Sequence, residues 1–486
     1  MRLGLSFFYY LLNNVGFRFL RFIVLILCAR LLNLDDFGVF STLFSLISIF
    51  GAISVFGMHN TVVKFGEESV RKGAHHFRHL LKISFGVNLV LGILFSWLVF
   101  AFRERISQYF GVPITPLLLG AASIIPWAAG RTMTFVFRAL RAPKKSVIID
   151  VSGPACFVIA LAFMAATGTS SLSNVMFGNL VTLAIPVMIG FLLLEKYTHG
   201  LPTPPVEAEK ERASALLAYS LFTFIVSLSG LTGGEADRLI IACFLDPQAV
   251  GQYNAAARSA FQLNLFYISF GYAFAPQLVA ERLDQAASPE RDSKRASLLF
   301  WLAAPFYLAA FGLGRYVMLL FGPGFLPALG VFLTIAVGGY INLLLGPSEI
   351  YLRMCGYPRV EARNMFLSMV VTLGTDFLLI PRIGIQGAAI GAASGLVAFK
   401  ILSCYDAKRR GLIYLPEKVL WRAGYAVPPL WGGIVFDRPL VPVLLVFVSL
   451  ALLLAVEQVS IRDLAASVKR MANGRVTTSQ ARGSVS

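Results

Sequence analysis

The chain has 486 residues, of which 57% are hydrophobic and only 14% are charged, and its mean hydropathy is +0.74. A soluble domain carries roughly a quarter charged residues, so this composition excludes an ordinary soluble protein. The net charge of +17 lies mainly in short segments between apolar runs, which is typical of membrane proteins. We therefore expect an all-α integral membrane protein with no nucleic-acid partner.

Apolar runs of about 20 residues recur along the whole chain, and each can cross a hydrocarbon core of roughly 30 Å as a helix. They predict about fourteen transmembrane helices. The first is too long and too polar in its centre for a cleaved signal peptide. The expected helices are 4–32, 37–63, 80–102, 114–138, 146–167, 173–194, 214–244, 250–280, 297–320, 326–352, 361–380, 386–404, 419–436 and 439–457.

Basic residues in alternate loops predict the orientation. Arg141–Lys145 and Lys408–Arg410 are two of the basic loops, whereas the loops between them hold few lysines or arginines. Because basic loops stay in the cytoplasm, both termini are expected there. The outer loops are short, which argues against membrane polymerases and ligases that carry large external catalytic loops.

Two matches between the halves of the chain indicate an internal repeat. A Leu-Asp turn followed by Gly-x-aromatic occurs at Gly38 and again 213 residues later at Gly251, and a Leu-Arg helix end occurs at Arg141 and again 212 residues later at Arg353. A duplicated six-helix unit keeps its orientation, and such parallel repeats bind substrate at their interface. The expected organisation is a lobe in 1–200, a lobe in 213–405, two further helices in 418–458 and a disordered tail in 472–486.

Polar residues on the first predicted helix share one face, since Asn14, Arg18 and Arg21 follow helical spacing. A charge in the bilayer centre costs at least about 2.5 kcal/mol, so Arg18 needs a partner or a polar cavity. One interpretation is a structural contact with a carboxylate of another helix. The other is that these residues form the cationic wall of a cavity.

Acidic and basic residues lie at similar depth on the seventh and eighth predicted helices. Glu235 and Asp237 lie toward the outer end of the seventh, and Asn254 and Arg258 share a face of the eighth. A structural ion pair between one acid and Arg258 is one interpretation. A gating pair, or a site for a coupling ion such as H⁺ or Na⁺, is the other.

Arg131 on the fourth predicted helix completes the candidate cavity, which is net cationic. A cavity of this kind favours an anionic substrate with a phosphate or pyrophosphate head, whereas a cavity for cationic drugs should be acidic or aromatic. The five cysteines show no CxxC or metal-type spacing. We expect no catalytic residues, no metal site and no cofactor other than a coupling ion.

Four segments carry a family resemblance. Residues 32–65, which begin LNLDDFGVF, resemble the opening of the polysaccharide flippases of the multidrug/oligosaccharidyl-lipid/polysaccharide exporter superfamily. The segments DRLII from Asp237 and GQYNAA from Gly251 resemble the start of that family's second lobe, and Ile380–Gly391 resembles its turn into the twelfth helix. The likeness extends to about Ser403.

The resemblance implies two six-helix lobes around a central cavity, with two additional C-terminal helices, in a bacterial inner membrane. It also implies that the protein moves undecaprenyl-pyrophosphate-linked oligosaccharide to the periplasmic leaflet by alternating access, coupled to an ion gradient. Arg18 matches a position at which family members often carry a cavity arginine. The implied partners are the lipid-linked oligosaccharide, membrane lipids, and a polysaccharide polymerase with its export machinery.

Other functions stay open on the sequence alone. A lipid II flippase would also need a basic cavity, while a multidrug exporter of the same fold is disfavoured by the arginines. From a different class, an integral-membrane glycan polymerase or ligase is disfavoured by the short outer loops. A purely structural scaffold does not explain why several arginines lie within the predicted transmembrane helices.

Overall fold

The computed structural model describes residues 3–72, 74–198, 210–265, 267, 289–412, 419–436 and 440–457. Within these ranges the chain forms helices and no strand. Eight helices are long and apolar enough to cross a membrane, or nine if the bent pair Arg103–Phe110 and Ile114–Ala139 is one span. The all-α, multi-pass membrane fold is thereby confirmed, whereas the number fourteen stays a prediction.

The first part of the chain departs from the expected helices at two places. The expected helix 37–63 is divided by a left-handed turn at Phe56 and Gly57, with φ of 47° and 74°. The expected helix 214–244 contains a π-helical turn, η1. The elements are α1 (Leu3–Leu31), α2 (Leu34–Val55), α3 (Met58–Lys72), α4 (Ala74–Ala101), α5 (Arg103–Phe110), α6 (Ile114–Ala139), α7 (Pro143–Thr167), α8 (Leu172–Thr198), α9 (Lys210–Leu231), η1 (Thr232–Ala236), α10 (Asp237–Phe244) and α11 (Pro247–Gln262).

The second part of the chain also contains broken helices. The expected helix 326–352 is interrupted at Gly346 and Pro347, and the expected helix 419–436 is two short helices. The expected tail 472–486 and most of 263–280 lie outside the described residues. The elements are α13 (Pro289–Leu319), the 3₁₀ turn η2 (Pro323–Ala328), α14 (Leu329–Leu344), α15 (Ser348–Met354), α16 (Pro358–Ile383), α17 (Ile385–Arg409), α18 (Val419–Gly424), α19 (Val427–Val435) and α20 (Leu440–Glu457).

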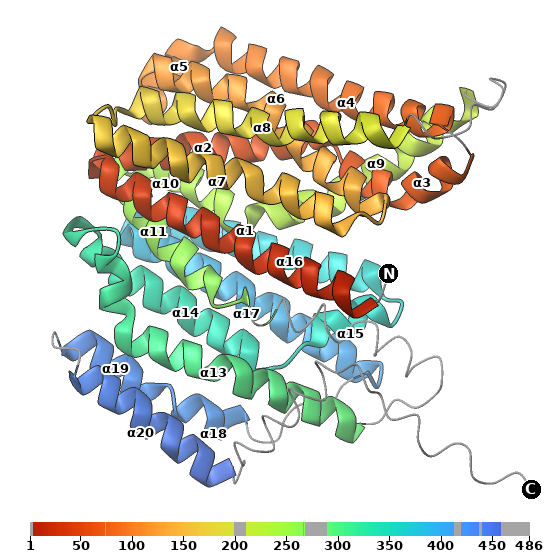
Figure 1. Ribbon diagram of the computed structural model, residues 1–486. Helices are drawn as coiled ribbons and strands as arrows, with labels where there is room; N and C mark the ends of the chain where they lie inside the picture. Colours follow the sequence, from red (N-terminus) through yellow and green to blue (C-terminus); the bar gives the residue numbers. More distant parts are fainter. Residues whose placement is uncertain are drawn as a thin grey trace, which may run out of the picture.

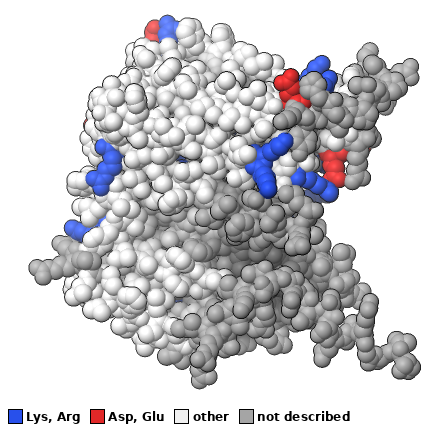
Figure 2. Space-filling view, viewed as in Figure 1, with Lys and Arg blue, Asp and Glu red and all other residues white. Residues whose placement is uncertain are grey.

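The helices run roughly side by side in two groups (Figure 1). Helices α4–α8 form the upper group in this view, α13, α14 and α18–α20 form the lower group, and α1 runs along the boundary between them. On the face shown in Figure 2, charged side chains gather near the helix ends and leave an uncharged band between them. Large apolar side chains stay exposed, for example Phe163 at 67% and Leu192 at 69%. Such a band is what a lipid-facing surface requires.

Helices α2 and α11 begin with the same kind of cap. The side chain of Asn33 accepts a hydrogen bond of 2.7 Å from the N–H of Asp36, and that of Asp246 accepts one of 2.8 Å from the N–H of Ala249. Each cap satisfies one of the N–H groups that a helix start leaves without a partner. Asn33 and Asp246 are separated by the same 213 residues as the glycines of the predicted repeat. The two helices therefore start in matching register.

Equivalent positions of the predicted repeat contact one another where α2 and α11 cross. The Nδ2 of Asn254 donates to the Oγ of Ser41 at 2.8 Å, and the Nε2 of Gln248 donates to the Oδ2 of Asp35 at 3.1 Å, each pair being 213 residues apart. In a symmetric pair, equivalent residues touch each other only close to the two-fold axis. Contacts of this kind are expected if the axis of the repeat lies at this crossing, and the repeat itself stays a prediction.

The outer end of the bundle, where α1 ends and α2 begins, is closed; this end is predicted to face the periplasm. At the crossing, a Cβ on Gly38 would lie 1.7 Å from the carbonyl oxygen of Pro247, so only glycine allows the approach. Nearby, Arg30 of α1 donates to the carbonyl oxygens of Leu319 and Leu320 at 2.6 and 2.8 Å. A cation at the C-terminus of α13 is stabilised by the helix dipole.

Candidate functional site

The π-helical turn η1 positions Glu235 between two arginines. Its carboxylate accepts from the Nη1 of Arg238 at 2.9 Å and from the Nη2 of Arg258 at 2.6 Å. The preceding Gly234 has a φ of 109°, a conformation that favours glycine. Isolated π turns within helices occur often at functional sites. The predicted ion pair between an acid of the seventh helix and Arg258 is therefore made by Glu235.

The two arginines that bind Glu235 have different surroundings. The side chain of Arg238 is only 3% exposed, and it also donates to the Oγ of Ser45 on α2 at 3.1 Å, which ties α10 to α2. The side chain of Arg258 is 32% exposed, and that of Glu235 is 16% exposed. Arg238 is thus an internal anchor, whereas Arg258 is accessible from outside the packed helices.

Arg21 on α1 belongs to the same group of charges. Its side chain is exposed, and its guanidinium lies 5.9 Å from the ring centroid of Phe44. It is close enough to Arg258, Arg131 and Glu235 for significant electrostatic interaction. An exposed arginine at this depth needs water or a polar cavity rather than lipid. The structure therefore brings together four of the predicted site residues, from α1, α6, η1 and α11.

Arg131 and Arg138, both on α6, have different roles. Arg131 is exposed and lies 5.6 Å from the ring centroid of Phe135. Arg138 instead pairs with Asp150 of α7 at 3.2 Å, which fits a structural contact near the helix end. The ring of His59 on α3 packs edge-on against Phe135 at 4.8 Å. Phe135 thus contacts both Arg131 and His59.

The remaining predicted cavity residues are placed differently. Asn254 is buried, and its amide binds Ser41 at the crossing of α2 and α11 rather than Arg258. Arg18 is half-buried on α1, one turn from Arg21. The side chain of Asn14 lies outside the described residues.

Asp237 binds Tyr253, whereas Arg258 binds Glu235, and Asp237 also lies beside a second acid that was not among the site residues predicted from sequence. The Tyr253 hydroxyl donates to its Oδ2 at 2.6 Å. Asp376 of α16 is also fully buried and interacts with Asp237. A Cβ on Gly391 of α17 would lie 1.9 Å from an oxygen of Asp376, so the glycine makes room for the carboxyl group.

The acid pair Asp237–Asp376 has unused acceptor capacity. One oxygen of Asp237 and both oxygens of Asp376 accept no hydrogen bond from a donor among the described residues. Two neighbouring carboxyl groups removed from water are not both ionised unless a cation lies between them. The pair can therefore hold a proton or a small cation.

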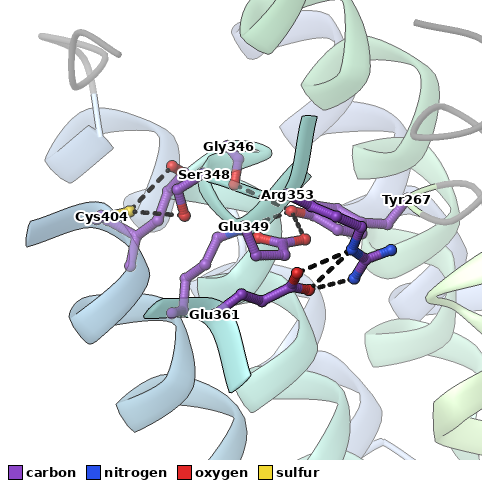
Figure 3. A network of polar contacts seen from close by, with 9 residues as sticks. Tyr267, Gly346, Ser348, Glu349, Arg353, Glu361 and Cys404 are labelled. Carbon is purple, nitrogen blue, oxygen red and sulfur yellow. Dashed lines mark hydrogen bonds and ion pairs between the residues drawn. The ribbon is translucent and has the colours of Figure 1, made fainter. Parts of the chain in front are cut away.

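A separate buried network joins α15, α17 and Tyr267 (Figure 3). The Nζ of Lys400 lies 2.6 Å from the Oε2 of Glu349 and 2.6 Å from the hydroxyl of Tyr267, and Tyr267 also donates to Glu349. Lys400 is 0% exposed. Because the charges are enclosed and mutually satisfied, this network is a structural ion pair. Lys400 was not among the residues predicted from sequence, although a lysine within an apolar helix is the signal that could have indicated it.

Comparison with known proteins places the chain among proteins of glycan synthesis. The model of the polysaccharide biosynthesis protein family matches residues 3–279. A relative from Haloferax volcanii, described as a probable low-salt glycan biosynthesis flippase, is 23% identical over 396 residues, which cover 79% of each chain.

Solved structures with similar folds are membrane transporters. The lipid II flippase MurJ in an inward closed conformation aligns with a TM-score of 0.67 at 11% identity, over 91% of this chain and 98% of that one. An inward-facing multidrug transporter of the MATE family, within the MOP superfamily, aligns with a TM-score of 0.65 at 11% identity, over 82% of this chain and 98% of that one. At these identities the likeness is one of fold. The relatives are flippases and transporters rather than enzymes, in agreement with the expectation from sequence.

Proposed function

Since the chain belongs to the polysaccharide biosynthesis protein family and is a multi-pass protein with the transporter fold of the MOP superfamily, we propose that it flips a lipid-linked glycan across the membrane. The substrate in this proposal is undecaprenyl-pyrophosphate-linked oligosaccharide, which moves from the cytoplasmic to the periplasmic leaflet of a bacterial inner membrane. At the periplasmic face, a polysaccharide polymerase and its export machinery would use the flipped lipid.

The observation that carries this proposal is the grouping of three arginines with Glu235: Arg258 binds Glu235 at 2.6 Å, and Arg21 lies within electrostatic range of Arg258, Arg131, Glu235 and Asp150. The group is net positive and accessible, which suits an anionic head group better than a cationic drug. Guanidinium groups bind phosphate oxygens through paired, charge-assisted hydrogen bonds. A pyrophosphate carries enough oxygens to contact more than one of these arginines.

Alternating access requires that the outer end open and close. In this structure the contacts of Gly38 and Arg30 close it, so substrate would enter from the predicted cytoplasmic side. Release to the periplasmic leaflet would require α2 and α11 to separate. The two halves of the parallel repeat are the bodies expected to move.

The acid pair Asp237–Asp376 is the proposed site of ion coupling. Both acids are buried, and Tyr253 of α11 binds Asp237. Their oxygens that accept no hydrogen bond are the proposed ligands of a proton or a Na⁺ ion. The prediction from sequence that Glu235 and Asp237 form a coupling or gating pair is modified in this proposal, because the two side chains bind different partners. Asp237 supplies the coupling site, and Glu235 belongs to the substrate site.

Coupling can be tested in proteoliposomes that contain a fluorescent undecaprenyl-pyrophosphate oligosaccharide. A pH gradient and a Na⁺ gradient are imposed separately, and flipping is measured for the wild type and for Asp376→Asn. The wild type should respond to one gradient, and the variant should lose that response. Equal responses of the two proteins would reject this acid pair as the coupling site. Glu104→Gln, an exposed acid on α5, is the matched control.

The substrate can be tested in cells that lack the gene, by measuring lipid-linked oligosaccharide on each membrane face. Accumulation on the cytoplasmic face, with loss of surface polysaccharide, is the expected result. Accumulation on the periplasmic face would favour a polymerase or ligase. Accumulation of lipid-linked peptidoglycan precursor instead would identify a lipid II flippase.

A further inference from the structure

We propose that Glu235 is an internal substitute for the substrate's pyrophosphate: it binds Arg258 in the empty cavity, is displaced when the head group enters, and returns when the head group leaves. This inference rests on the proposed function. It assigns Glu235 a positioning role that competes with substrate for the same guanidinium.

The two ends of the Glu235 carboxylate are bound unequally. One oxygen binds the accessible Arg258 at 2.6 Å, and the other binds the buried Arg238 at 2.9 Å. Arg238 is fixed in turn by Ser45 of α2. When pyrophosphate takes Arg258, the carboxylate therefore keeps one arginine partner. The exchange replaces one anion at Arg258 by another and leaves no buried charge unpaired, which is the costly outcome.

The exposure of the pair separates it from a purely structural contact. The enclosed pair Lys400–Glu349 shows 0% and 8% exposure, so no ligand can reach it. The pair Arg258–Glu235 shows 32% and 16% exposure. A ligand can thus approach the Arg258 guanidinium without breaking the helix packing. The guanidinium has five N–H donors, so an incoming anion can begin to bind before Glu235 leaves.

The surrounding charges explain why an internal anion is useful. Arg258 and Arg131 repel Arg21 when no substrate is present, and Glu235 offsets part of that repulsion. A returning carboxylate also competes for Arg258 while the head group is leaving. Glu235 therefore weakens binding of the head group and speeds its release. This benefits a transporter, which must release its substrate after each transport cycle.

The experiment measures equilibrium binding of undecaprenyl pyrophosphate to the purified full-length protein in lipid nanodiscs. Glu235→Gln keeps the shape and removes the competing charge. Its Kd should fall about tenfold, which corresponds to about 1.4 kcal/mol. In flipping assays the same variant should show a lower KM together with a lower kcat. Unchanged or weaker binding by Glu235→Gln would overturn the inference.

Further variants test the partner and guard against misfolding. In an Arg258→Gln background, Glu235→Gln should give no gain in affinity, because the shared partner is gone. Glu235→Asp, whose shorter carboxylate retains its charge, should bind with a Kd between those of the wild type and Glu235→Gln. Glu104→Gln removes an exposed charge and should leave Kd unchanged. Equal gains with and without Arg258 would also overturn the inference.

The failure of this inference differs from failure of the proposed function. If the wild-type protein binds no undecaprenyl pyrophosphate, the proposed function is wrong. If the wild type binds the lipid and Glu235→Gln does not bind it more tightly, the function stands and the role of Glu235 is wrong.

Discussion

Replacing Gly38 by alanine should open the outer end of the protein. The new Cβ would lie 1.7 Å from the carbonyl oxygen of Pro247, whereas an ordinary carbon–oxygen contact is about 3.3 Å. The helices α2 and α11 must therefore move apart. Overpacking of this kind costs about 1–3 kcal/mol, and it acts only on the closed arrangement. The ratio of closed to open molecules should fall by about 5–150-fold.

Spin-label distances can measure this shift. Labels at Gln108→Cys on α5 and Leu320→Cys after α13 lie at the outer ends of the two helix groups, and both side chains are exposed. The five native cysteines are first replaced. In nanodiscs, the wild type should show mainly the short distance. Gly38→Ala should show a longer distance in a much larger fraction of molecules.

Two other glycines provide graded controls. A Cβ on Gly251 would lie 3.1 Å from the Phe37 ring and 3.2 Å from the backbone nitrogen of Gly38, so Gly251→Ala should cause a smaller shift. A Cβ on Gly374 would meet no described atom within 4 Å, so Gly374→Ala should cause none. A Gly38→Ala protein as closed as the wild type, or a larger effect at Gly251, would refute the reasoning.

Three further predictions concern charged residues. Arg18→Ala should abolish flipping, although the variant protein reaches the membrane in normal amounts. A normal amount of surface glycan in cells with this variant would show that Arg18 is not a cavity residue. Lys400→Ala should lower the free energy of unfolding by about 3–5 kcal/mol, because Glu349 stays buried without its cation. The double variant Lys400→Met with Glu349→Gln should restore most of the lost stability, as measured in thermal melts. Arg30→Lys should weaken outer closure by less than Gly38→Ala, as seen in the same distance measurement, because one ammonium replaces a guanidinium that binds two carbonyls.

The length and spacing of the apolar runs were sufficient to predict the class of fold and most helix positions. The runs at 80–102, 146–167 and 173–194 correspond to α4, α7 and α8, because a long apolar stretch has few alternatives to a membrane helix. The breaks were harder to predict. The turn at Phe56 and Gly57 interrupts an apolar run without a proline, and η1 depends on a packing arrangement that spacing does not reveal.

The candidate site was predictable where two consecutive helices carry opposite charges at the same depth. The pairing of Arg258 with an acid of the seventh helix followed from equal depth, and the structure contains it. Asp376 was not among the predicted site residues, but it is buried beside Asp237, and Gly391 of α17 makes room for it. Asn254 shared a face with Arg258 but binds α2. Such contacts depend on how helices cross, which one sequence does not specify.

The crossing of α2 and α11 also determines how gradually the outer end can open. Its contact at Gly38 consists of backbone atoms, and the hydrogen bond from Asn254 to Ser41 joins two short side chains. Packing attraction loses about a quarter to a half of its strength over a gap of roughly 0.5–1 Å, and short hydrogen bonds do not stretch far. A slightly widened crossing therefore loses its stabilising contacts before any passage for a head group exists. The outer end should open in a single step, with no stable half-open width through which ions could leak.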